Sequence, residues 1–192
     1  MGYILLTALA GAAGGLGAWA IAEPFAPSSF FDPAWEKWGV MFSLLIGAMV
    51  SGALGGVLGW NQGGRLHVFR GLGIGIVLGA IGGSSGLRAG STLAESVFGN
   101  VLSQPGLSAS HIPARILMFT VFGIVLGAVV GVTTLTSRQI LIGAIGGAIG
   151  GALSGATFDL ISTMTQDISR QMRGGDEVGI VGRALTSLTI GG

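Results

Sequence analysis

The sequence predicts an all-α integral membrane protein, with about five transmembrane helices packed in a glycine-zipper bundle. Composition is the first observation behind this prediction: half of the 192 residues are hydrophobic, only 9% are charged, and the mean hydropathy is +0.79. A soluble domain carries about 25% charged residues, so this chain lacks the polar surface that keeps a domain in water. The other two observations are its long apolar runs and the regular spacing of its glycines.

Five apolar runs reach, or nearly reach, the ~20 residues that a helix needs to cross the hydrocarbon core of a bilayer. They contain no Asp, Glu, Lys, Arg or His, and they cover residues 3–22, 39–60, 71–87, 116–135 and 140–158. Residues 1–160 are therefore predicted to form one polytopic membrane domain. The first run has an alternative, because it ends in Ala20-Ile21-Ala22, a small-x-small pattern typical of signal-peptidase sites. Its start lacks the usual basic residues, which favours a retained span.

Glycine recurs every fourth residue in three of these runs, which places it in a slanted row on one helix face. Such a row forms a groove where a second helix backbone can approach closely. We expect the following glycines to be helix-packing residues: Gly71, Gly75, Gly79, Gly83, Gly123, Gly127, Gly131, Gly143, Gly147, Gly151 and Gly155. Glycine weakens lipid partitioning, and it weakens helicity by ~1 kcal/mol relative to alanine. Runs 71–87 and 140–158 are therefore expected inside the bundle, with the bulkier runs 39–60 and 116–135 as their partners.

The second and third runs, and the fourth and fifth, look like two copies of one unit. Each copy has a bulky run, a link that carries arginine, and a run with a row of four glycines. This predicts two pseudo-repeated hairpins. The link at 136–139 is so short that its flanking helices must be antiparallel, whereas 61–70 is a short basic connection. Residues 88–115 are long enough for an amphipathic helix around 93–102.

Two segments outside the runs are expected at the membrane surface. Residues 23–38 are rich in proline and place Trp35 and Trp38 beside charged residues, as headgroup-level anchors do. Residues 161–192 begin with apolar side chains at helical spacing, which predicts an amphipathic C-terminal helix. Their last eleven residues, GRALTSLTIGG, are similar to the start of the fourth run, ARILMFTVFG, and suggest the start of a further repeat.

Residues 141–159 read LIGAIGGAIGGALSGATFD and are preceded by Arg138. This stretch resembles the glycine-zipper membrane repeats of bacterial multi-span proteins, some of which are joined to phosphopeptide-binding forkhead-associated domains. The resemblance covers residues 110–160 well and residues 38–90 loosely. It implies a multi-pass protein of the cell (inner) membrane and a role as the membrane anchor of a larger sensor or signalling protein.

The motifs favour a non-enzymatic protein without a cofactor or metal. The string GSSG at 83–86 fits the GxSG pattern of rhomboid-type intramembrane proteases, whose serine needs a histidine at the same depth. His67 and His111 both fall in connections, so Ser84 and Ser85 are expected to hydrogen-bond along their own helix. Cysteine is absent, which excludes thiolate sites. The net charge of +1 argues against a nucleic-acid partner.

Four charged residues are candidate functional groups. Asp159 follows the fifth run and is a candidate for gating or an ion pair; the alternative is that it marks where the helix leaves the lipid. Arg65, Arg70 and Arg138 lie in the two short links, which are expected on one side of the membrane. They are candidate contacts to phosphate or lipid headgroups, and the alternative is that they are solvated anchors.

The leading functional expectation is a membrane scaffold or assembly module, whose glycine zippers pack within the chain and between copies or against other membrane proteins. The alternative is a small channel or transporter lined by the glycine-rich helices. The five runs offer only Ser, Thr and glycine backbone as polar groups, which makes a pore the less favoured reading. A third possibility is the anchor of a sensor.

Overall fold

The computed structural model describes residues 2–27, 34–100, 111–134 and 136–171, together with residues 187, 188 and 191. This part of the chain is helical, and its elements are α1 (Gly2–Ala22), η1 (Glu23–Phe25), α2 (Ala34–Asn61), α3 (Arg65–Phe98), α4 (His111–Val132) and α5 (Ser137–Gln171). Within it, five helices are long and apolar enough to cross a membrane. The chain is thus an all-helical, multi-pass membrane protein.

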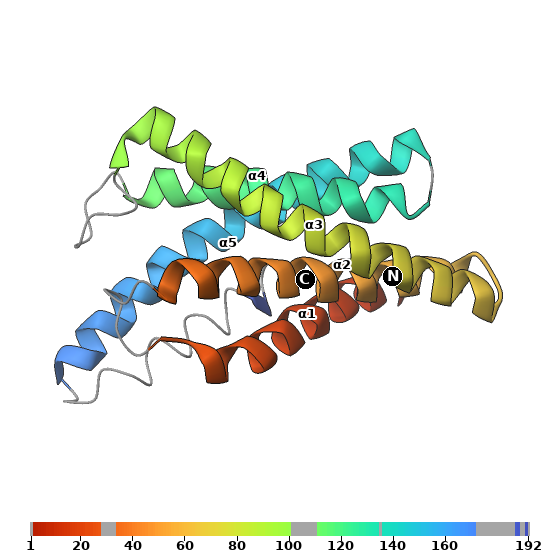
Figure 1. Ribbon diagram of the computed structural model, residues 1–192, viewed down its shortest axis with the longest axis horizontal. Helices are drawn as coiled ribbons and strands as arrows, with labels where there is room; N and C mark the ends of the chain where they lie inside the picture. Colours follow the sequence, from red (N-terminus) through yellow and green to blue (C-terminus); the bar gives the residue numbers. More distant parts are fainter. Residues whose placement is uncertain are drawn as a thin grey trace.

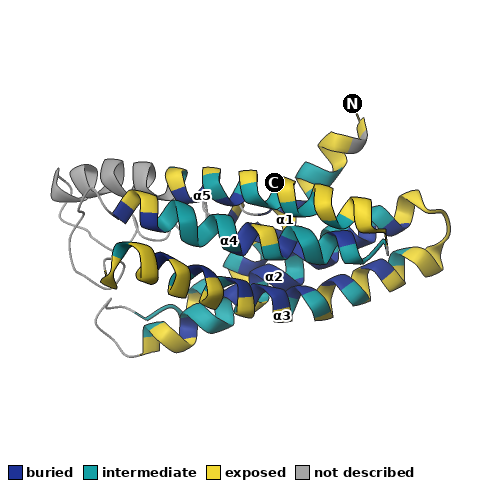
Figure 2. Cartoon of the chain, turned by 90° about the horizontal axis from the view of Figure 1, so that it is seen from above, coloured by how far each residue is buried: buried dark blue, intermediate teal, exposed yellow. Residues whose placement is uncertain are grey.

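Successive helices run in alternating directions, and the α2–α3 and α4–α5 turns lie at the same end of the bundle (Figure 1). Helix α2 is central, because it packs against α1 and α3 and also touches α4. The apolar core consists of Ala18 from α1, Ile46 and Val50 from α2, and Phe122 and Leu126 from α4. Figure 2 shows the buried residues concentrated where these helices meet.

The helices are longer than the apolar runs predicted. The expected connection at 61–70 shrinks to three residues, because Gly63 and Gly64 adopt φ angles of 84° and 94° and reverse the chain within a tight turn. Helix α3 then continues without a break to Phe98, so no separate helix begins near residue 93. Helix α5 likewise runs through Phe158 to Gln171, which makes the fifth span and the start of the amphipathic segment one helix.

The prediction that both glycine-row helices lie inside the bundle is wrong for α5. Helix α5 is at the edge, where it exposes a series of large apolar side chains: Leu141, Ile142, Ile145, Ile149 and Leu153 (Figure 2). The innermost helix is α2, which the sequence placed among the bulky partners. The burial of a helix depends on how many helices pack around it, whereas a regular glycine row predicts only one packing partner.

Trp38, expected at the membrane surface, packs between the end of α1 and the start of α2. Its side chain is only 7% exposed, and its indole N–H donates a hydrogen bond to the Ala22 carbonyl oxygen at 3.0 Å. The indole also stacks on Phe42, with ring centroids 4.7 Å apart. Because an indole N–H in an apolar setting needs an acceptor, this bond ties the end of α1 to the first turns of α2.

The described C-terminal residues return to α1. The Ser187 and Gly191 carbonyls lie so close to Gly15 and Gly11 that a Cβ on either glycine would overlap them. Both Ser187 and Gly191 are buried. Gly11 and Gly15 are four residues apart, as are Ser187 and Gly191, so α1 closely contacts the region where a further repeat was expected. Residues 172–186 lie outside the described part.

Candidate functional site

The α2–α3 interface is built from two facing rows of small residues. A Cβ added to any glycine of the α3 row would overlap a backbone carbonyl of α2, in the pairs Gly71–Gly55, Gly75–Ser51, Gly79–Gly47 and Gly83–Ser43. The partners on α2 are themselves four residues apart. In an antiparallel pair, equal spacing on both helices keeps the two backbones in contact along the whole crossing.

The row of small residues on α2 was not predicted. Its signal was present, because Ser43, Gly47, Ser51, Gly55 and Gly59 recur every fourth residue within the second apolar run. The bulky Leu, Met and Val residues between them make the second run look like a uniformly apolar helix, so its four-residue periodicity is harder to recognise. Since these small residues share one face, α2 both fills the core with its large side chains and offers its backbone to α3.

The α4–α5 interface repeats this arrangement. A Cβ on Gly123 or Gly127 of α4 would overlap the carbonyl of Gly147 or Gly143 of α5, and the reverse substitutions would meet the same backbones. The row continues at both ends through three further glycines that meet backbone atoms of the opposite helix: Gly131, Gly151 and Gly155. All of the predicted helix-packing glycines therefore lie against a neighbouring backbone.

Helix α3 carries a second row of small residues, which was not predicted from the sequence. Gly82, Gly86 and Gly90 are buried and face α4, and Ala94, four residues further on, is also buried. A Cβ on Gly86 would lie 3.1 Å from Val125 Cβ, while one on Gly82 would lie 2.9 Å from Val129 Cγ2. These contacts are mostly with side chains, so α4 fits bulky residues into a groove of α3. Two rows on one helix let α3 join the two hairpins.

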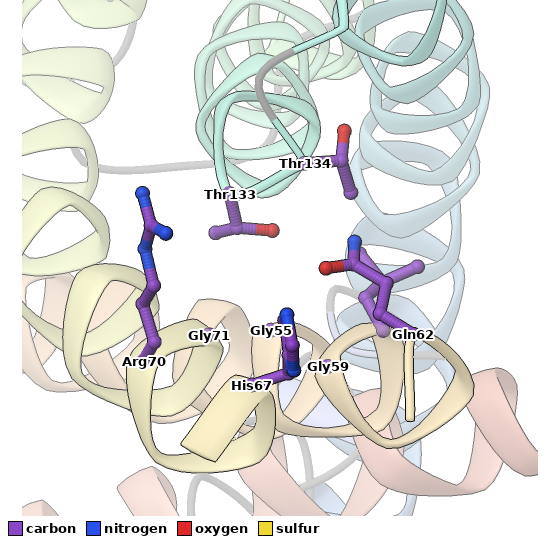
Figure 3. Close-up of a pocket in the computed structure, with 9 residues that line it drawn as sticks. Gly55, Gly59, Gln62, His67, Arg70, Gly71, Thr133 and Thr134 are labelled. Carbon is purple, nitrogen blue, oxygen red and sulfur yellow. The ribbon is translucent and has the colours of Figure 1, made fainter. Parts of the chain in front are cut away.

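A polar pocket of about 130 Å³ lies between the two tight turns at one end of the bundle. The turn after α2 contributes Gln62, the first turns of α3 contribute His67 and Arg70, and the turn after α4 contributes Thr133 and Thr134 (Figure 3). Glycine backbone of α2 and α3 forms its floor, at Gly55, Gly59 and Gly71. The threonine hydroxyls already donate to their own helix, to the Val130 and Gly131 carbonyls at 2.7 Å.

The three candidate arginines lie at this same end of the bundle but differ in their position relative to the pocket. Arg70 lines the pocket, whereas Arg65 and Arg138 do not contribute to its walls. Arg65 is the first residue of α3 and Arg138 the second of α5, and both are exposed. All three arginines were predicted as one group because they lie in the short links. The pocket neighbours of Arg70, which are Gln62, Thr133 and Thr134, were not predicted.

An apolar hollow of about 710 Å³ opens between α2, α4 and α5. Its walls include Val50, Phe122, Leu126, Ile149 and Leu153. Two glycines of α5 also border it, and a Cβ on either would meet nothing within 4 Å: Gly146 and Gly150. Leu188 and Gly191 border it as well. This hollow gives α5 an open face beside the helices that enclose it on the other side.

Within the described part of the chain, the remaining candidates do not assemble into a reactive centre. Ser84 and Ser85 donate hydrogen bonds to carbonyls of their own helix, at 3.1 Å and 2.7 Å to Ile81, as the sequence predicted. His67 lies at the end with the tight turns, while His111 starts α4 at the opposite end and is buried. Within the described ranges, no three His, Asp or Glu side chains gather to hold a metal ion. The side chain of Asp159 lies outside the described part.

Comparison of the chain with protein-family models, with curated proteins and with solved structures finds no significant match.

Proposed function

We propose that this protein is a non-enzymatic scaffold or assembly module of the bacterial inner membrane, built from two pseudo-repeated glycine-zipper hairpins. The observation that carries this proposal is the backbone-to-backbone packing of α2 on α3 and of α4 on α5 through facing rows of small residues. Close approach of this kind favours van der Waals packing, which drives helix association in lipid. The partners are the bilayer and further copies of the chain or other membrane proteins.

Self-association is assigned to the open face of α5. That face combines exposed apolar side chains with Gly146 and Gly150, four residues apart, which have no neighbour where a Cβ would stand. Glycines with the same four-residue spacing, from Gly143 to Gly155, pack against α4 elsewhere on α5. A second copy that laid a helix along this face would extend the packing used inside the chain.

Cysteine cross-linking tests this proposal cleanly, because the chain has no cysteine of its own. Ile149→Cys places one thiol on the open face of α5, at a side chain that is 58% exposed, and Val77→Cys is a control on α3 at 60% exposure. In vesicles at a low protein-to-lipid ratio, oxidation is expected to yield a disulfide dimer from the Ile149→Cys variant only.

A further substitution sharpens the cross-linking test. Gly150→Leu places a bulky side chain on the open face, where an added Cβ would meet nothing within 4 Å, so it should abolish the Ile149→Cys dimer while the monomer stays folded. Equal dimer yields from the Ile149→Cys and Val77→Cys variants would reflect random collision and would contradict self-association through α5. Absence of dimer from both variants would contradict it as well.

The apolar hollow favours a second candidate function, a small channel or transporter. Clefts of about 300–1,000 Å³ with mostly apolar walls commonly hold small molecules between the helices of bundles, and this hollow falls in that range at about 710 Å³. Ion and dye flux from vesicles tests this function. Flux that Gly146→Leu reduces would support transport through the hollow, whereas an absence of flux from inserted, folded protein would contradict it.

A further inference from the structure

The pocket between the two tight turns is suited to an anion. The lining side chains that carry N–H donors are the Arg70 guanidinium, the Gln62 amide and the His67 ring. Within the described part of the chain, neither Arg70 nor Gln62 makes a side-chain hydrogen bond to another residue. Thr133 and Thr134 can only accept there, because their protons are already used. The site therefore holds donors from α3 and from the turn before it, beside a glycine floor.

Among the described residues at this end of the bundle, the charged side chains are all basic. Asp and Glu are absent from residues 37–94 and 96–158, so neither α2 beyond Glu36 nor α4 carries a carboxylate that could neutralise Arg70. Arg65 and Arg138 add positive charge close by. A planar guanidinium with several donors matches a phosphate group in geometry as well as in charge.

The residues around the pocket are of the kind found at the level of lipid headgroups. Trp60, Leu66 and Phe69 lie within four residues of Gln62 or Arg70 and are 70%, 79% and 71% exposed. Large apolar side chains of this kind, with a tryptophan among them, are typical of the membrane–water interface. Arg70 thus stands where the apolar surface of the bundle gives way to the turns.

We propose that Gln62, His67 and Arg70 bind a phosphate group at this end of the bundle, and that its source is the headgroup of an anionic phospholipid. The small size of the pocket, about 130 Å³, suits one phosphate group with its acyl chains outside, along the exposed apolar side chains. A free phosphate would use the same donors without those chains. This binding role goes beyond assembly and does not depend on self-association.

Lipid binding by the purified full-length chain in neutral detergent tests the proposal. Native mass spectrometry compares phosphatidylglycerol with phosphatidylcholine of the same acyl chains, for the wild type, Arg70→Gln and Arg65→Gln. Arg65 is a matched control, because it lies on the same helix and at the same end but outside the pocket. Either change removes one surface charge, which costs a little affinity for any anionic lipid. Arg70→Gln is expected to weaken phosphatidylglycerol binding about five- to tenfold more than Arg65→Gln.

A second arm distinguishes the source of the phosphate. Thermal unfolding is followed with inorganic phosphate and with chloride at matched ionic strength, in the absence of anionic lipid. Stabilisation by phosphate that only Arg70→Gln abolishes, together with equal lipid binding by all three proteins, would keep the phosphate site but overturn its assignment to lipid. Equal losses of lipid binding from Arg65→Gln and Arg70→Gln, without phosphate stabilisation, would overturn the site.

Gln62→Leu keeps the test valid if Arg70→Gln fails to fold. This substitution removes an amide donor from the pocket and leaves the net charge unchanged, so a general electrostatic effect would not respond to it. Phosphatidylglycerol binding is expected to fall about threefold or more, since an unmade hydrogen bond to a charged group costs several-fold in affinity. Unchanged binding by folded Gln62→Leu protein would overturn the proposed donor set.

Discussion

The two hairpins of this protein use the same contact in different surroundings. In both, small residues four apart bring two antiparallel backbones together, at Gly47 and Gly79 in one hairpin and at Gly123 and Gly147 in the other. The α2–α3 hairpin is enclosed, because α1 packs on α2 and α4 packs on α3. The α4–α5 hairpin leaves one side of α5 open beside the hollow. Residue spacing thus specifies which two helices pack together. The helices around that pair determine how far the two backbones can separate when a larger side chain is introduced.

Gly79→Leu is expected to have the largest effect. Its side chain would meet the Gly47 carbonyl and Ser51 Cβ, and α2 cannot retreat because α1 packs behind it. Overpacking costs about 1–3 kcal/mol even where neighbours can adjust, so we expect almost no folded monomer in detergent. Gly73→Leu is the control on the same helix, since a Cβ there meets nothing within 4 Å. Size-exclusion chromatography measures both, and a normal yield of Gly79→Leu protein would show that the enclosed contact is not formed.

Gly147→Leu tests the open hairpin and is expected to do less damage. The new side chain would meet the Gly123 carbonyl and Gly127 Cα, but α5 can move toward its open side. We expect folded protein that is destabilised by about 1–3 kcal/mol, with α5 cleaved faster by protease while α1 to α4 stay protected. Gly146→Leu provides the neighbouring control. Equal losses of folded protein from Gly147→Leu and Gly79→Leu would contradict the difference between the hairpins.

Alanine substitutions on α3 compare a backbone contact with a side-chain contact. Gly83→Ala would overlap the Ser43 carbonyl, whereas Gly86→Ala would lie 3.1 Å from Val125 Cβ and 3.4 Å from Phe122 Cδ2. Side chains can shift by a few tenths of an ångström, and alanine gains ~1 kcal/mol of helix propensity over glycine. Gly86→Ala is therefore expected to be neutral within about 1 kcal/mol, and Gly83→Ala to cost about 2 kcal/mol. Thermal unfolding in detergent measures both, and the reverse order would refute the assignment of the two rows.

The smallest expected effect on stability comes from replacing two buried serines, Ser51 and Ser154, with alanine. Ser51 in the enclosed hairpin has a buried hydroxyl with no hydrogen-bond partner, while Ser154 in the open hairpin donates to the Gly150 carbonyl at 2.8 Å. Removing an unsatisfied hydroxyl relieves a desolvation cost, whereas removing a bonded one loses about 0.5–1.5 kcal/mol. Ser51→Ala should leave the unfolding temperature unchanged or raise it, and Ser154→Ala should lower it. A clear decrease for Ser51→Ala would show that its hydroxyl finds a partner in the membrane.

Much of the fold could be predicted from the sequence, because the signals involved are local. The apolar runs indicated five helices, the four-residue link at 136–139 required an antiparallel α4–α5 pair, and glycine spacing indicated which helix faces would meet a backbone. Helix ends were less accurate: the absence of breaking residues lets α3 and α5 continue beyond their apolar parts. The positive φ angles of Gly63 and Gly64 shorten the turn in a way that composition alone does not indicate.

The candidate site was predictable only in part. Arg70 was identified from its position in a basic link, but Thr133 and Thr134 lie more than sixty residues away in the sequence and come close only because both tight turns share one end. The second row on α3 and the row on α2 follow a readable spacing, yet several faces of each helix carry small residues. Spacing alone does not choose among those faces.

By itself, the sequence determined that this chain forms long apolar helices with faces smooth enough for backbones to touch, because hydrophobicity and four-residue periodicity act along the chain. The tertiary structure alone decided that α2 is central, that α5 borders an open hollow, and that Gln62, His67 and Arg70 share a pocket with the end of α4. The physical reason is that burial and side-chain convergence depend on which helices become neighbours. In lipid, where apolar surface alone does not select a partner, that choice rests on the fit of whole faces.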